Sequence, residues 1–321
     1  MNFLDTLFFL VKNMIPYMIP LTIVALGGMF SERSGIVNIA LEGIMVFGAS
    51  FGIFYIYFLP NLLPPQLTLV VALLVALVSG MIFSLLHAYA SINLKANQTI
   101  SGTALNLFAL AFHDFLARLI TPNAVEGVRF DNVYRIIKVP LLGDIPLIGD
   151  LFFKDVYATT YLGFAILIIA SFVLYKTRFG LRLRACGEHP QAADSVGIKV
   201  NRMRYAGVLI SGALAGLGGL ILVVPSTVEY TGTVSGYGFL ALAVLIFGQW
   251  KPSRIFLAAA FFGLMQVIAN SSGLSFFTAL GINKYFYQIV PFVTTLIVLT
   301  FTSQKSAAPK AAGEPYDPGK R

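Results

Sequence analysis

The stretch LTLVVALLVALVSGMIFSLLHAYAS, residues 67–91, decides the fold class of this chain. It runs for 25 residues without a Lys, Arg, Asp or Glu, and about 20 helical residues are enough to cross a hydrocarbon core of about 30 Å. The strict polar and apolar alternation of a membrane β-barrel strand is missing. A membrane-spanning helix is the expected structure.

The composition extends this expectation to the whole chain. Of the 321 residues, 57% are hydrophobic and 11% are charged, and the mean hydropathy is +0.82, far from the values of soluble domains. We predict an all-α integral membrane protein, a polytopic bundle of about 8–10 transmembrane helices, with one transmembrane domain over residues 1–303. The apolar runs predict spans near 14–30, 43–59, 67–91, 99–117, 157–175, 205–224, 236–249, 255–270 and 285–302.

Charge sets the expected sidedness. The loop over 176–204 holds seven basic residues against two acidic ones, which predicts a cytoplasmic loop by the positive-inside rule. Alternation of the spans then places Arg33, Lys95 and Lys251 on the same side. The loop over 118–156 balances five bases with five acids, as expected of an external loop. Topology therefore explains the net charge of +8, and no nucleic-acid partner is expected.

The end of the chain, residues 304–321, is rich in Ala, Pro, Gly and charged residues. Such a composition cannot bury a core, so we predict a disordered cytoplasmic tail. The side on which the N-terminus lies stays open, because a broken element near 31–50 would change the count of spans.

A short polar helix is predicted inside the 176–204 loop. Pro190 suits the first helical position, and Gly197 suits a left-handed residue just after the helix. Ala192 and Ala193 between them give the helix a flat surface. So short a helix is marginal in water and needs a partner to pack against. From spacing alone, an ordinary solvated loop remains the alternative.

Three stretches resemble one transporter family, the ATP-binding-cassette (ABC) importer permeases of the simple-sugar and nucleoside branch. The run RFGLRLRACGEHPQAADSVGIKVNRMRYAGVLISGALAGLGG, residues 178–219, resembles the cytoplasmic coupling segment of that branch. The stretches at 27–49 and 236–255 resemble nucleoside-type members in the same order along the chain. The coupling pattern is matched here by Gly187, Glu188, Pro190, Ala192, Ala193, Gly197 and Ile198.

The resemblance implies a mechanism and a set of partners. The short helix would dock on a separate ABC ATPase subunit, which is expected to hydrolyse ATP because this sequence has no G-x-x-x-x-G-K-[ST] phosphate loop. A second homologous permease subunit, as homodimer or heterodimer, and an extracytoplasmic substrate-binding protein or lipoprotein would complete a system in the bacterial cytoplasmic membrane. The cargo would be a nucleoside or a sugar. We expect neither an enzyme nor a cofactor.

Two residues of the stretch SERSGIVNIALEG are candidates for the substrate pathway. Asn38 and Glu42 are four positions apart and share a face if the segment is helical. A carboxylate in a membrane usually faces the bundle interior or a water-filled path. The alternative for Glu42 is a position at the cytoplasmic interface, paired with Arg33.

A second polar cluster begins the span near 99–117. Asn97 and Asn106 carry amides that match the hydroxyls of a ribose or the edge of a base, and Phe108 offers a ring for stacking. Polar residues that hold helices together are the alternative for each amide.

The remaining titratable residues set the rival hypotheses. A secondary transporter driven by protons or sodium would use Glu42 or Asp114 as its coupling group. His113 and Asp114 are neighbours and point about 100° apart on a helix, so with no third ligand a metal site is not expected. An intramembrane enzyme would need a convergent nucleophile and base, and none is evident in the sequence.

Overall fold

The computed structural model describes residues 3–59, 62–121, 127–146, 148–271, 307–317 and 319, with the single positions 286, 289 and 293. The helices are α1 (Phe3–Arg33), α2 (Leu41–Phe58), α3 (Pro65–Ile92), α4 (Gln98–Ile120), α5 (Ile148–Phe152), α6 (Ala158–Lys176), α7 (Arg178–Glu188), α8 (Pro190–Ser195), α9 (Val200–Ser226), α10 (Tyr237–Phe247) and α11 (Pro252–Asn270). The other elements are the 3-10 helix η1 (Leu142–Asp144) and the strands β1 (Val128–Arg129), β2 (Arg135–Lys138), β3 (Lys154–Tyr157) and β4 (Glu229–Tyr230).

Seven helices in the described ranges are long and apolar enough to cross a membrane: α1, α2, α3, α4, α6, α9 and α11. They coincide with seven of the predicted spans, and the all-α polytopic membrane fold is confirmed. The predicted span over 285–302 lies outside the described residues except at three single positions.

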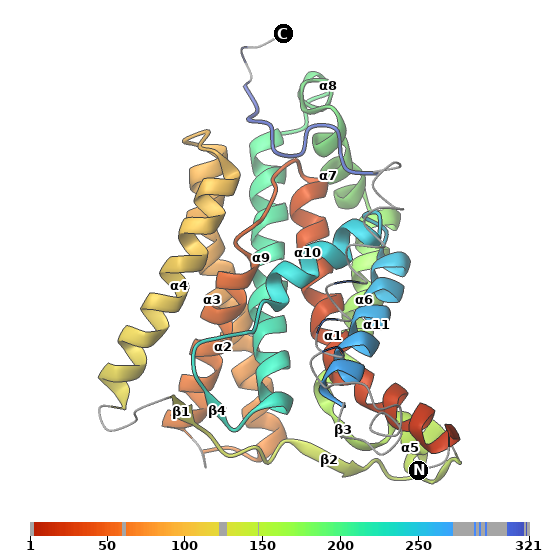
Figure 1. Cartoon of the computed structure of the whole chain (residues 1–321). Helices are drawn as coiled ribbons and strands as arrows, with labels where there is room; N and C mark the ends of the chain where they lie inside the picture. The colour runs from red at the N-terminus through yellow and green to blue at the C-terminus, as the bar shows by residue number, and fades with distance from the viewer. Residues whose placement is uncertain are drawn as a thin grey trace.

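The prediction that residues 236–249 span the membrane is wrong. The helix there, α10, has 11 residues and rises only about 16 Å, half of a hydrocarbon core. It begins inside the bundle because a carboxylate of α2 caps its start: Glu42 accepts hydrogen bonds from the backbone N–H of Gly236 at 2.9 Å and of Gly238 at 2.6 Å. Figure 1 shows α10 lying obliquely across the bundle beside α2.

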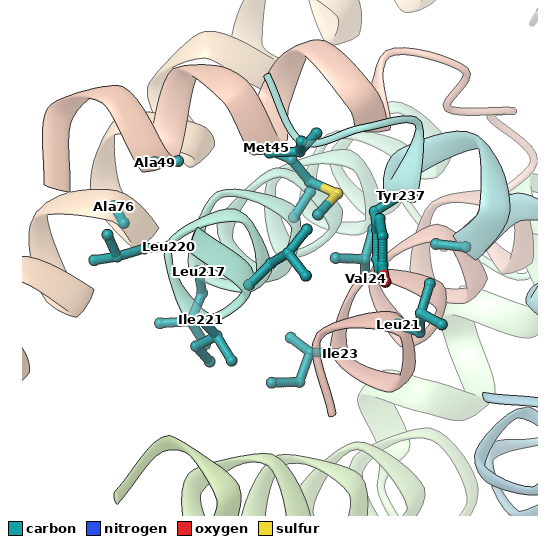
Figure 2. Packing of buried hydrophobic residues seen from close by; sticks show 14 of the residues in the cluster. Leu21, Ile23, Val24, Met45, Ala49, Ala76, Leu217, Leu220, Ile221 and Tyr237 are labelled. Carbon is teal, nitrogen blue, oxygen red and sulfur yellow. The ribbon is translucent and has the colours of Figure 1, made fainter. Parts of the chain in front are cut away.

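Helix α9 forms the centre of the bundle, with α1, α2 and α3 packed around it (Figure 1). Glycines allow the closest approach: a β-carbon on Gly80 of α3 would lie 2.8 Å from the Cα of Gly216 in α9. Small residues permit such backbone contact between membrane helices. Figure 2 shows Leu217, Leu220 and Ile221 of α9 among side chains from α1, α2, α3 and α10.

The two ends of the bundle differ. Helices α7 and α8 lie at one end, which we call the α8 end, while β1 to β4 and α5 lie at the other, the β end (Figure 1). The loop predicted over 118–156 is partly folded: β1 pairs with β4 and β2 pairs with β3, both antiparallel. The β end is therefore a small folded cap.

The predicted disorder of the tail does not hold for residues 307–317. This segment lies across the α8 end (Figure 1), and Tyr316 is buried in a cluster with Cys186, Ala193 and Val200. The N–H of Ala311 donates to the carbonyl of Gly187 at 2.9 Å, and further backbone hydrogen bonds hold other residues of the segment. The composition is poor in apolar residues, but one buried ring and a set of backbone partners supplied by the bundle are enough to order the segment.

Candidate functional site

The short helix predicted between Pro190 and Gly197 is present as α8. Pro190 occupies its first turn, where a missing N–H needs no partner. Gly197 has φ +83° and its N–H donates to the carbonyl of Asp194 at 2.8 Å, so it ends the helix in the left-handed conformation that glycine adopts without strain.

The two alanines of α8 differ in burial. Ala193 is 3% exposed and packs against Cys186, Val200 and Tyr316, which are the partners that so short a helix requires. Ala192 is exposed at the tip of the molecule. The exposed side of α8 continues into Val196, a large apolar residue that is 75% exposed. The helix is thus packed on its buried side, and on its other side it exposes Gln191, Ala192, Asp194 and Ser195 next to the apolar Val196.

Gly187 and Glu188, at the end of α7, contact the end of α1 and the tail. The Glu188 carboxylate lies 3.4 Å from the guanidinium of Arg33 at the end of α1, and it accepts a hydrogen bond from the N–H of Lys310. The carbonyl of Gly187 accepts from Ala311. These contacts connect the helix pair α7 and α8 to the end of α1 through side chains and through the tail.

The junction between α1 and α2, residues 34–40, is held by amides. The Asn38 side chain donates to the hydroxyl of Ser211 in α9 at 2.9 Å and accepts from the N–H of Ala40 at 3.1 Å. Asn106 of α4 accepts from the N–H of Gly43 at 2.7 Å and donates to the carbonyl of Ile39 at 3.0 Å. Both amides therefore satisfy backbone groups at the start of α2.

Two further residues of this region were not among the sequence candidates. His87 of α3 lies 3.0 Å from the carbonyl of Val37 through Nε2. Glu32 accepts a 2.6 Å hydrogen bond from the indole N–H of Trp250. The signal for both was a polar side chain inside an apolar run, which points to a buried partner.

Asn97 and Phe108 lie apart from this junction. Asn97 caps α4, since its side-chain oxygen accepts from the N–H groups of Thr99 and Ile100. Phe108 is about half exposed and stacks with Phe83 and Phe112 at centroid distances of 6.0 and 5.4 Å. The structure thus brings Asn38, Glu42 and Asn106 together and leaves Asn97 and Phe108 outside that group.

The chain is similar to one known protein family and to several known proteins over most of its length. Residues 10–299 match the family described as the permease component of branched-chain amino acid transport systems. Over its full length the chain is 43% identical to the guanosine ABC transporter permease protein NupQ of Bacillus subtilis, which is also covered completely. It is 40% identical to the nucleoside ABC transporter permease protein NupC of Lactococcus lactis, over 98% of this chain and 99% of the relative.

Two less similar relatives are also described as ABC transporter permease proteins. The putative glucose ABC transporter permease protein TsgC13 of Haloferax volcanii is 30% identical over 92% of this chain and 94% of its own length. A second guanosine permease protein of Bacillus subtilis, NupP, is 25% identical over 80% of this chain and 71% of its own length.

Proposed function

Because the chain belongs to the permease-component family of branched-chain amino acid transport systems, we propose that it is the pore-forming subunit of an ATP-driven importer of nucleosides. The observation that carries the transport mechanism is α8, a short helix that is packed on one side and exposed on the other at one end of the bundle. The cargo is inferred from the full-length identity to NupQ and NupC, which is higher than that to the glucose permease protein.

We infer that the α8 end is cytoplasmic, because basic side chains gather there. Cytoplasmic loops of membrane proteins carry an excess of Lys and Arg, and this orientation also puts the C-terminal segment on the cytoplasmic side. The basic residues on the described elements and loops of this end are Arg33, Lys95, Lys176, Arg178, Arg182, Arg184, Lys199, Arg202, Arg204, Lys251, Arg254 and Lys310.

A partner ATPase would dock on α8 and supply the energy of ATP hydrolysis. In this proposal the exposed Ala192 touches the ATPase, and Pro190 and Gly197 set the start and end of the helix. Ala193, Gly187 and Glu188 act indirectly, because their contacts are with α7, α9, Arg33 and the tail. Motion of the docked ATPase would then pass through α7 to the end of α1.

The predicted pathway residues fit an indirect role as well. We propose that Asn38, Glu42 and Asn106 position the starts of α2 and α10, since their polar groups already bind backbone partners. Asn97 would act as the cap of α4. Phe108 is about half exposed, on the apolar surface of α4.

A second permease subunit is the expected neighbour in the membrane. Helix α4 buries only a narrow face against α2 and α3 and exposes Leu107, Phe108 and Phe115. The pair NupQ and NupP shows that one organism holds two different guanosine permease proteins related to this chain. We propose a heterodimer of this kind, and a substrate-binding protein that delivers cargo at the β end.

The cargo is tested by uptake of labelled guanosine into cells that express this chain with its transport partners. We expect saturable uptake that an excess of unlabelled nucleosides suppresses and that ribose and glucose leave unchanged. Suppression by a sugar but by no nucleoside would contradict the nucleoside assignment and favour a sugar importer.

A further inference from the structure

A cavity of about 360 Å³ lies beside the segment that joins α9 to α10. Its walls come from α1, the end of α9, residues 227–235, the start of α10 and the end of α11. The volume falls within the range of about 300–1,000 Å³ that small-molecule sites occupy. The cavity therefore has room for one small ligand.

The side chains around the cavity are mostly neutral and polar. Gln266 and Asn270 supply amides, Ser226 and Thr233 supply hydroxyls, and the end of α9 adds aliphatic surface. Groups of this kind pair with the hydroxyls of a sugar and with the edge of a base, because each amide both donates and accepts.

The charged side chains around the cavity limit the class of ligand that it can bind. Glu229 is the one charged side chain among the described lining residues, and it lies 3.2 Å from the guanidinium of Arg129. The described lining contains no Lys or Arg to balance a phosphate. Burying an unpaired anion is costly, so the cavity suits an uncharged nucleoside and disfavours a nucleotide.

Two tyrosines supply aromatic surface. The rings of Tyr17 and Tyr237 both border the cavity, with centroids 6.5 Å apart. Tyr237 is 5% exposed, and its hydroxyl has no hydrogen-bond partner within the described part of the chain. Figure 2 shows its ring beside Leu21 and Val24 of α1. The Tyr237 hydroxyl has no accessible surface, so other atoms of this residue border the cavity.

The wall formed by 227–236 is fixed to α2 on its far side. The Tyr230 hydroxyl donates to the carbonyl of Val46 at 3.2 Å, and Glu42 holds the N–H groups of Gly236 and Gly238. Any displacement of α2 would therefore move this wall, so the shape of the cavity depends on the helix that starts at the α1–α2 junction.

We propose that this cavity is the site at which the permease holds its cargo, and that the cargo is bound as an uncharged nucleoside through the amides of Gln266 and Asn270. The proposal rests on the proposed function as a nucleoside importer. It assigns cargo contact to residues other than the five polar and aromatic candidates chosen from sequence.

Equilibrium binding tests the site. Tritiated guanosine is titrated onto the purified transporter complex in nanodiscs, without the substrate-binding protein and without ATP. We expect Gln266→Leu and Asn270→Leu each to raise Kd about tenfold, since each loses a hydrogen bond to the ligand. The matched control Gln66→Leu, at an exposed amide of α3 outside the cavity, should leave Kd unchanged. Guanosine monophosphate should fail to compete.

Three results would overturn the site: unchanged Kd in both cavity variants, full competition by guanosine monophosphate, or absence of saturable binding to a wild-type complex that still imports guanosine. Size-exclusion profiles show whether each variant assembles, and neither Gln266 nor Asn270 is buried in the bundle. A wild-type complex without ATP-dependent guanosine uptake would instead contradict the proposed function, so the two failures are distinguishable.

Discussion

Replacing Ala192 with arginine is expected to reduce nucleoside uptake to the background of cells that lack the ATPase. Ala192 lies on the exposed face of α8, so the variant keeps its fold, because substitutions at exposed sites usually change stability by about 0.5 kcal/mol or less. A long charged side chain on a flat docking face would have to lose its hydration without a partner, which blocks association. Copurification of the ATPase and uptake of labelled guanosine are the measurements.

The matched control is Ala307→Arg, also an alanine exposed at the α8 end. It should leave both ATPase capture and uptake close to wild type. Normal ATPase capture by Ala192→Arg would show that α8 is not the docking helix. Ala193→Arg is the weaker test, because Ala193 is buried and its replacement would displace α8 itself.

Replacing Tyr316 with alanine is expected to make Cys186 react with maleimides about a hundredfold faster. Cys186 is fully buried under the tail, and burial raises the pKa of its thiol to about 11, against the opposing effect of the Arg204 guanidinium. A raised pKa keeps the thiol protonated and unreactive at neutral pH. Exposure returns the pKa toward its ordinary value of about 8.5, and the thiolate fraction rises accordingly.

The labelling is specific because Cys186 is the single cysteine in the sequence. Time courses of N-ethylmaleimide labelling, followed by mass spectrometry, give the rate for each variant. Tyr175→Ala, at a residue outside the cluster around Cys186, should label at the wild-type rate. Equal rates for wild type and Tyr316→Ala would mean that the tail does not cover the α8 end.

Most spans could be predicted because hydrophobic length is a local property. The exception, α10, shows where a local signal fails: residues 236–249 are as apolar as a true span, but the helix is limited to 11 residues by a break inside the bundle. That break depends on Glu42, 194 positions away from Gly236. A window of sequence does not contain such a contact. The tail presents the same difficulty, since Tyr316 is its one aromatic residue and becomes ordered only against Cys186 and Ala193.

The candidate site could be predicted in part. Pro190 and Gly197 are local signals for the two ends of a helix, and α8 follows them. Asn97 also carries a local signal, because Asn before a helix favours a cap, and it acts as one. Whether Asn38 and Asn106 bind cargo or backbone is set by tertiary contacts with Ser211 and Gly43, and no spacing rule distinguishes the two. The cavity near Tyr237 joins three distant segments of the sequence, so sequence patterns do not reveal it.

The central claim is that this permease is driven by ATP hydrolysis in a partner, and one uptake experiment tests it most directly. Cells carrying the chain with its ATPase are supplied with labelled guanosine, and the phosphate-loop lysine of the ATPase is replaced by alanine. The proposed mechanism predicts loss of uptake with the permease still present in the membrane. Uptake that persists in this variant and disappears when the ion gradient is collapsed would contradict it and identify a secondary transporter.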